Sequence, residues 1–123
     1  MLAEPWSAES RFSRVDYRDV ADVAAIALLQ DRLLCGTFEL CADGKLNRED
    51  VAELISEVTG RQIRAHRTDP DTLGESANAM RPMFAHYDHH GLVGSSLTLR
   101  AILGREPRTL RAYFEELARK PGD

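Results

Sequence analysis

Residues 36–60 limit the possible folds of this chain more than any other segment does, because three signals for local structure follow one another without a gap. They read GTFELCADGKLNREDVAELISEVTG. Residues 37–41 favour extended backbone, and the ADGK that follows is typical of a turn. Asn47 is a good helix N-cap with Asp50 three residues later, apolar residues then recur at helical spacing, and Gly60 marks the helix end. We therefore expect a strand, a turn and a capped helix.

The same stretch resembles the calcium-binding loop of an EF-hand over residues 39–50. Gly44 stands at the sixth loop position, where the loop needs a glycine. Glu39, Cys41 and Asp50 stand at the first, third and twelfth positions, where the loop prefers Asp, a hard oxygen ligand and Glu. We favour the strand, turn and helix, and keep an EF-hand-like calcium-binding protein as the alternative.

Two further short strands are expected in the first half of the chain. Residues 11–15 carry the apolar Phe12 and Val15, and residues 61–66 follow a helix-ending glycine.

A helix is expected over residues 18–29, which carry an apolar stripe at helical spacing and few charges. Asp16 and Asp19 are spaced like an acidic capping box, in which the first carboxylate accepts from backbone N–H groups of the first turn. Because so few charged residues lie on it, we expect this helix to be buried on much of its circumference.

After residue 66 only helical patterns follow. Asp69 before Pro70 is a cap followed by proline in the first helical turn. Residues 95–104 are typical of a short capped helix closed by a glycine, and residues 106–120 give a last amphipathic helix.

Length and composition place these segments in one small domain of the α/β class. The chain has 123 residues, of which 43% are hydrophobic and 29% charged, as in globular proteins. We divide this single partial domain, residues 1–123, into an irregular segment 1–11, a strand and helix part 12–66 and a helical lobe 67–123.

Charge and hydropathy exclude several classes of function. The net charge of −4 argues against a general nucleic-acid binder, which needs a basic face. No apolar run reaches the roughly 18 residues of a membrane span. The start of the chain lacks the basic and apolar regions of a signal peptide, and the two cysteines match no common metal or redox motif. We expect a cytoplasmic protein.

Residues 86–90, HYDHH, allow two interpretations. His86 and His90 are four residues apart and could share a helix face as zinc ligands, with Asp88 as a third. Gly91 follows directly, however, and the protease motif H-E-x-x-H is absent from the sequence. We favour a solvated or pocket-lining helix end, and we assign no metal ligand and no catalytic residue.

Three segments occur in a recognisable order: VDYRDVADVAAIAL at 15–28, GTFELCADGKLNREDVAELISEVTGRQIRAH at 36–66, and LRAILGREPRTLRAYFEEL at 99–117. Together they resemble the C-terminal part of NmrA-like proteins, an atypical branch of the short-chain dehydrogenase/reductase superfamily. In that family a VD-x-RDVA segment leads into a long helix, a strand and a capped helix follow, and LGREPRTL introduces the last helix. The resemblance covers roughly residues 5–118. It implies a partial Rossmann-like fold with a helical C-terminal lobe, and a strand-to-helix link instead of a calcium loop.

The resemblance also implies what this sequence lacks. Family members hold NAD(P) on a glycine-rich turn and a helix N-terminus, and catalytic members carry a Tyr-x-x-x-Lys pair. Neither motif occurs here. The chain resembles the substrate-side portion of such a protein. We expect it to be catalytically inert alone and to hold no cofactor in isolation, while NAD(P) is implied for the complete family fold.

Three functions stay open: a part of an NAD(P)-dependent oxidoreductase, an NAD(P)-binding regulator or ligand-binding module without chemistry, and the calcium-binding alternative. The candidates for lining a small-molecule pocket are Trp6, Arg14, Tyr17, Phe84 and Tyr87. Without a dinucleotide-binding half, one side of the helix over 18–29 and nearby strand residues would be uncovered. We therefore expect a homodimer, or a complex with the complementary dinucleotide-binding half.

Overall fold

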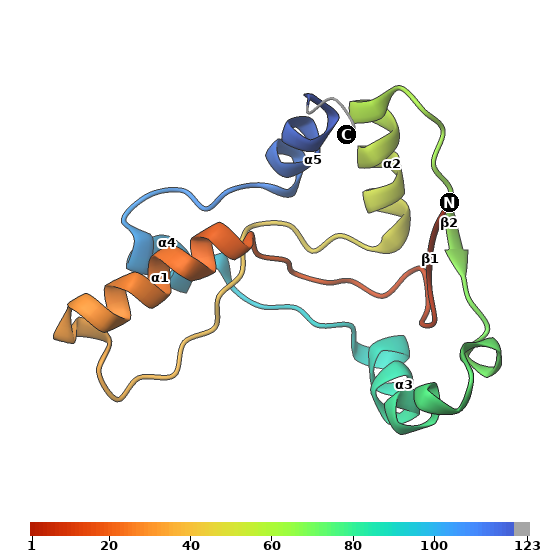
Figure 1. Cartoon of the computed structure of the whole chain (residues 1–123), viewed down its shortest axis with the longest axis horizontal. Coiled ribbons are helices and arrows are strands. Elements are labelled where there is room, and N and C mark those ends of the chain that lie inside the picture. The colour runs from red at the N-terminus through yellow and green to blue at the C-terminus, as the bar shows by residue number, and fades with distance from the viewer. Residues whose placement is uncertain (120–123) are drawn as a thin grey trace. The chain divides into compact units, whose positions relative to one another are not determined.

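The computed structural model describes residues 1–119, except for the side chain of Ser76. The described residues form five α-helices, three 3-10 helices and two short strands (Figure 1). In chain order these are β1 (Leu2–Glu4), α1 (Tyr17–Leu29), η1 (Asp31–Leu33), α2 (Arg48–Thr59), β2 (Ala65–Arg67), η2 (Pro70–Leu73), η3 (Glu75–Met80), α3 (Arg81–His90), α4 (Ser96–Leu103) and α5 (Leu110–Arg119).

The chain folds into two compact units, each assembled from two separate stretches. Unit 1 comprises Met1–Phe12 and Lys45–Val93, and unit 2 comprises Ser13–Gly44 together with the residues from Gly94 onward. Unit 1 therefore contains both strands with α2 and α3, whereas unit 2 contains α1, α4 and α5.

The two strands of unit 1 lie side by side and parallel, with Leu2 opposite Ala65 (Figure 1). The Leu2 N–H donates to the Arg64 carbonyl and the Thr68 N–H to the Glu4 carbonyl, each at 2.9 Å. This parallel pair places the start of the chain beside residues that follow α2. The sequence did not predict β1, because its pairing partner lies far along the chain and three residues show no alternation of their own.

The capped helix predicted after Asn47 is α2. The Asn47 side chain accepts from the Asp50 N–H at 2.8 Å, and the Asp50 carboxylate accepts from the Asn47 N–H at 3.0 Å. This reciprocal capping box satisfies two backbone donors at the helix start. Gly60 ends the helix in the left-handed conformation, with φ +67°, as predicted.

The core of unit 2 lies where α1 packs against α4 (Figure 1). Its buried residues are Val23, Leu99 and Ile102, and the partly buried residues packed against them are Val15, Ile26, Leu33, Leu40 and Leu103. The predicted short helix is α4, which begins at the Ser95 cap and ends at Gly104 in left-handed backbone. The predicted last helix is α5.

Two of the three predicted strands are wrong. Residues 37–41 are irregular, and in 11–15 only Phe12 forms isolated bridges, to Leu46 and Leu92. The backbone N–H and C=O groups of a strand must pair with those of a neighbouring strand. An apolar pattern in the sequence does not show whether such a neighbour exists. The strand expected at 61–66 is present in shorter and shifted form as β2.

The prediction that the first helix is buried on much of its circumference is also wrong. In α1 only Asp19 and Val23 are buried, whereas Leu28 is 87% and Leu29 82% exposed. An apolar helix surface is buried only where another element packs on it, and here α4 covers a single side. None of the described helices, α1 included, is long and apolar enough to cross a membrane.

Candidate functional site

The five predicted pocket residues fall in both units. Trp6, Phe84 and Tyr87 belong to unit 1, whereas Arg14 and Tyr17 belong to unit 2. Tyr17 is the first residue of α1 and is 87% exposed, and Arg14 is partly buried in the segment leading to it. The three residues of unit 1 are brought together in one cluster.

An aromatic cluster of Trp6, Phe12, Phe84 and Tyr87 lies in unit 1. The Trp6 ring centroid is 5.6 Å from that of Phe12, 6.1 Å from Phe84 and 5.2 Å from Tyr87. Phe12 and Tyr87 meet edge to face at 5.2 Å, a geometry that aromatic pairs favour. The Trp6 indole Nε1 is buried and has no hydrogen-bond acceptor among the described residues. The cluster thus holds one unused donor.

Hydrogen bonds hold the N-terminal segment of the cluster against α3. The Ser7 N–H donates to the Asp88 carboxylate at 2.6 Å, and the Ser10 hydroxyl donates to the Tyr87 carbonyl at 2.6 Å. The Leu92 N–H donates to the Arg11 carbonyl at 2.9 Å, just after α3 ends. These contacts join residues about 80 positions apart, so no local pattern in the sequence could reveal that Phe12 completes the cluster.

A buried arginine fixes the backbone on which Trp6 stands. Arg48, the first residue of α2, is 2% exposed. Its guanidinium donates to the Glu4 carboxylate at 3.0 Å, to the His66 carbonyl at 2.7 Å and to the Trp6 carbonyl at 2.7 Å. One side chain therefore connects β1, β2 and the segment carrying Trp6. The planar fork of five donors in arginine is suited to several acceptors at once.

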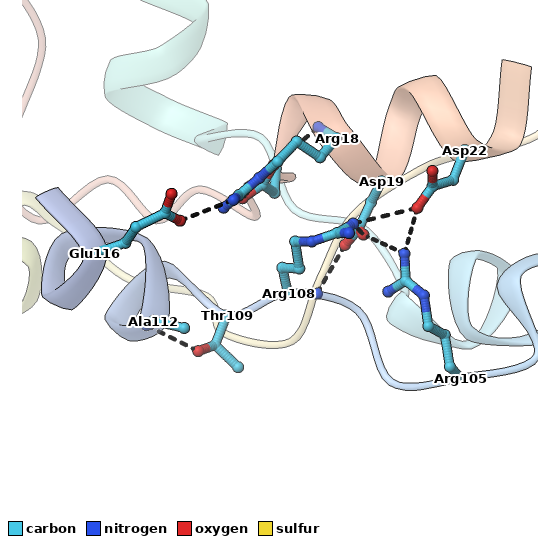
Figure 2. A network of polar contacts seen from close by, with 9 residues as sticks. Arg18, Asp19, Asp22, Arg105, Arg108, Thr109, Ala112 and Glu116 are labelled. Carbon is cyan, nitrogen blue, oxygen red and sulfur yellow. Dashed lines mark hydrogen bonds and ion pairs between the residues drawn. The ribbon is translucent and has the colours of Figure 1, made fainter.

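Unit 2 contains the opposite arrangement, a buried carboxylate among arginines. Asp19 is fully buried and accepts from the Arg108 N–H at 2.7 Å, from Arg105 Nη2 at 2.8 Å and from Arg108 Nη1. Asp22, one turn along α1, accepts from Arg105 at 2.5 Å and from Arg108 at 3.2 Å. Figure 2 shows both arginine side chains directed at the two carboxylates. We call these four residues the Asp19 cluster.

Charge in the Asp19 cluster is balanced, with two carboxylates and two guanidiniums. Hydrogen bonds from Arg108 and then from Arg105 lower the pKa of Asp22, and the hydrogen bond to Asp19 raises the pKa of Arg105. Asp22 and Arg105 therefore stay ionised at neutral pH, and all four side chains are already paired with one another, so the cluster has no charge left over for a ligand. Its role is to fasten α1 to the segment before α5.

The Asp19 cluster also explains two sequence motifs that were predicted separately. The RDVAD of residues 18–22 supplies both carboxylates, and the REPR of residues 105–108 supplies both arginines. Asp19 was expected to take part in a capping box, and only Asp16 does so, accepting from the Arg18 N–H at 2.8 Å. The opposite charges of the two motifs were the signal that could have paired them.

The carboxylates of the calcium-like loop are each engaged within their own unit. In unit 2 the Asp43 carboxylate accepts from the Ser96 hydroxyl and from Arg100, which lowers its pKa. Glu39 accepts from the Ser95 N–H at 2.9 Å. In unit 1 Asp50 caps α2. The loop carboxylates therefore serve as contacts at helix ends. For Asp50 this is the capping role that was expected from a strand, a turn and a capped helix.

Solved structures of two proteins share this fold. A nucleoside-diphosphate-sugar epimerase from Staphylococcus aureus superposes with a TM-score of 0.76 at 14% identity, over 92% of this chain and 43% of the epimerase. Triphenylmethane reductase from Citrobacter sp. superposes with a TM-score of 0.72 at 16% identity, over 94% of this chain and 44% of the reductase. The same reductase complexed with NADP(H) gives a TM-score of 0.73 at 17% identity, again over 94% of this chain and 44% of the reductase.

These comparisons confirm the predicted fold class, a mixed α/β chain that matches part of a Rossmann-like fold. The chain spans less than half the length of the proteins whose fold it shares. Their low identity to this chain supports the fold alone. No protein-family model and no curated protein matches the sequence.

Proposed function

We propose that this chain is the substrate-side part of an NmrA-like protein, an NAD(P)-dependent oxidoreductase or an NAD(P)-binding regulator, and that it is catalytically inert by itself. The observation that carries this proposal is the superposition of nearly the whole chain on less than half of an epimerase and of a reductase. The contacts between the RDVAD and REPR motifs support the family, because two separate parts of its sequence pattern form one cluster.

The residues at the N-termini of three of the five described α-helices do not suit a dinucleotide. Pyrophosphate groups bind at helix N-termini, where backbone N–H groups are free and the helix dipole is positive. Here carboxylates already stand at three such ends: Asp16 caps α1, Asp50 lies in the first turn of α2, and Glu39 accepts from the Ser95 N–H at α4. Like charge would repel a pyrophosphate at each of them. The dinucleotide of the complete fold is therefore assigned to the complementary part.

The aromatic cluster of unit 1 is the proposed wall of the substrate pocket. Trp6 and Tyr87 are partly exposed and provide flat apolar surfaces, as small-molecule sites usually do, whereas Phe84 is 5% exposed and packs against Trp6. The buried Trp6 Nε1–H has no acceptor among the described residues. Arg14 and Tyr17 remain candidates from unit 2.

The exposed side of α1 is the proposed contact surface for the complementary dinucleotide-binding part. Its exposed residues are Ala21, Ala24, Ala25, Ala27, Leu28 and Leu29. Burial of apolar surface yields roughly 25 cal/mol per Å², so about 600 Å² would provide on the order of 15 kcal/mol before the costs of association. When the complementary part is absent, a second copy of the chain is expected to cover this side as a homodimer.

Calorimetry with NADPH tests the first proposal. We expect no binding to the chain alone at micromolar concentrations, and tight binding would contradict its assignment as the substrate-side part. A positive control is the triphenylmethane reductase whose complex with NADP(H) is known.

Light scattering coupled to size-exclusion chromatography tests the contact surface. We expect the chain to be a dimer at tens of micromolar and Leu28→Glu to be a monomer, because the charge would have to be buried. Met80→Glu is the matched control, since Met80 is also an exposed apolar residue but belongs to unit 1. A parent chain that is already monomeric would contradict this surface without bearing on the fold.

A further inference from the structure

Three histidines occupy the last two turns of α3. His86, His89 and His90 are all exposed. The ring centroids of His86 and His90 lie 4.9 Å apart, with an interplanar angle of 37°, whereas His89 is 6.3 Å from His90. Side chains four residues apart lie one above the other on a helix face. His86 and His90 therefore form a close pair on one face, and the His89 ring lies farther from that of His90.

The separation of this pair suits two imidazoles that bind the same metal ion. With metal–nitrogen bonds of about 2.0–2.1 Å, a ring centroid lies about 3.2 Å from the ion. Two rings that meet at roughly 90–110°, as in octahedral or tetrahedral coordination, then have centroids about 4.5–5.2 Å apart. The observed 4.9 Å falls within that range.

The surroundings leave the pair available to a cation. Gly91 ends α3 directly after His90, and the negative end of the helix dipole lies at this point. Asp88 is already engaged, because it accepts from the Ser7 N–H and from Arg67. Among the described residues no group of three or more His, Cys, Asp or Glu side chains is placed to hold a metal. Water must therefore complete the coordination.

We propose that His86 and His90 chelate a divalent ion that prefers imidazole, namely Ni²⁺, Cu²⁺ or Zn²⁺, with water in the remaining positions. Mg²⁺ and Ca²⁺ prefer oxygen ligands and should not bind. The site lies entirely in unit 1 and is independent of the function proposed above. Loss of either imidazole converts a two-point attachment into a single bond, which should weaken binding on the order of 10²-fold.

Isothermal titration with NiCl₂ tests the site, with MgCl₂ as the ion control. All proteins in this experiment carry the substitution Cys35→Ser, because the exposed thiol of Cys35 could itself bind nickel. The protein with this substitution alone is called the parent. His86→Gln and His90→Gln remove the two ligands, and His89→Gln is the matched control from the same helix end. We expect one equivalent of nickel to bind the parent and the His89→Gln variant with equal affinity, and both ligand variants to lose it.

Two results would overturn the proposal. Equal weakening in all three variants would indicate diffuse attraction to a histidine-rich helix end, and unchanged affinity in His86→Gln or His90→Gln would place the metal elsewhere. Thermal melts of each variant without metal show whether it is folded. Because these histidines are exposed, the substitutions should leave the melting temperature unchanged.

Discussion

Among the described residues, units 1 and 2 each bury one charged residue, of opposite sign, and satisfy it in different ways. Arg48 in unit 1 is 2% exposed and donates mainly to backbone carbonyls, with Glu4 as its one carboxylate. Asp19 in unit 2 is fully buried and accepts from two guanidiniums that are themselves 38% and 36% exposed. Arg48 therefore depends on the position of the backbone, whereas the partners of Asp19 remain in contact with water.

The comparison also shows what a buried charge does in a unit built from two stretches of chain. Arg48 comes from the second stretch of unit 1 and bonds Glu4 and Trp6 of the first. Asp19 comes from the first stretch of unit 2 and bonds Arg105 and Arg108 of the second. A buried charge needs specific partners, and it therefore joins distant segments in one arrangement where apolar packing would tolerate several.

Arg48→Ala should have the largest effect on stability. It leaves the Glu4 carboxylate and two backbone carbonyls without their donor, which should lower the free energy of unfolding by about 3–5 kcal/mol. Urea unfolding measures the loss, and hydrogen exchange should increase in β1 and β2. Arg48→Met, which keeps most of the volume, separates the lost donors from the lost packing. Equal exchange in both units after Arg48→Ala would contradict a local role.

Asp19→Asn should have a smaller effect, confined to unit 2. The amide keeps one acceptor for the Arg108 N–H, and the freed guanidiniums can turn to water and to Asp22, so we expect a loss of about 1–3 kcal/mol. Asp22→Asn is the control at the exposed end of the cluster, with an expected change within about 0.5 kcal/mol. If Asp22→Asn cost as much as Asp19→Asn in urea unfolding, burial would not be what distinguishes them.

The helix ends of both units could be predicted from the sequence, because local signals determine them. Asn47 with Asp50, Ser95 with Gly104, and Asp16 all cap the helices expected from them. Each signal acts within a few residues of the end that it marks, so the rest of the fold does not alter it.

The strands and the site could not be predicted in the same way, because they depend on residues far apart. The pattern at 37–41 is that of a strand, yet no neighbour pairs with it. The burial of Asp19 depends on arginines more than 80 positions away, and Phe12 joins Trp6 and Tyr87 only through contacts with α3. Long-range pairing is the part of a fold that single-sequence patterns carry least well.

Acid should weaken unit 2 before unit 1. Three carboxyls of unit 2 have a lowered pKa because neighbouring side chains hydrogen-bond to them: Asp16 by Arg18, Asp22 by Arg108 and Asp43 by Ser96. The pKa of Asp16 falls from 3.8 to about 2. A group whose pKa is lower in the folded state than in the unfolded state stabilises the fold at pH values above its unfolded pKa. For Asp16 that stabilisation is lost as the pH falls through 3.8 towards about 2.

Hydrogen exchange, corrected for the intrinsic rates, measures the acid stability of the two units separately. The measurement runs from pH 5 to pH 2, because the pKa shift of Asp16 falls within this range. We expect α1 to lose protection first, by about 1 kcal/mol for Asp16, since its partner Arg18 is 47% exposed and screened by water. In unit 1 the Ser7 hydroxyl lowers the pKa of Glu9, an exposed group with little effect. If β1 and β2 lost protection from exchange at a higher pH than α1, unit 1 would be the unit that is less stable to acid.

Calcium should have no effect on either unit. Glu39 and Asp43 are hydrogen-bonded within unit 2, and Asp50 caps α2 in unit 1, so calcium would have to displace contacts that already stabilise helix ends. A sensor-grade site at 100 times its Kd would add about 2.7 kcal/mol, which is several degrees in melting temperature for a domain of this size. Thermal melts in millimolar calcium and in chelator should coincide. A clear upward shift with calcium, lost in Asp43→Asn, would restore the EF-hand interpretation and show that these helix-end contacts give way to a metal.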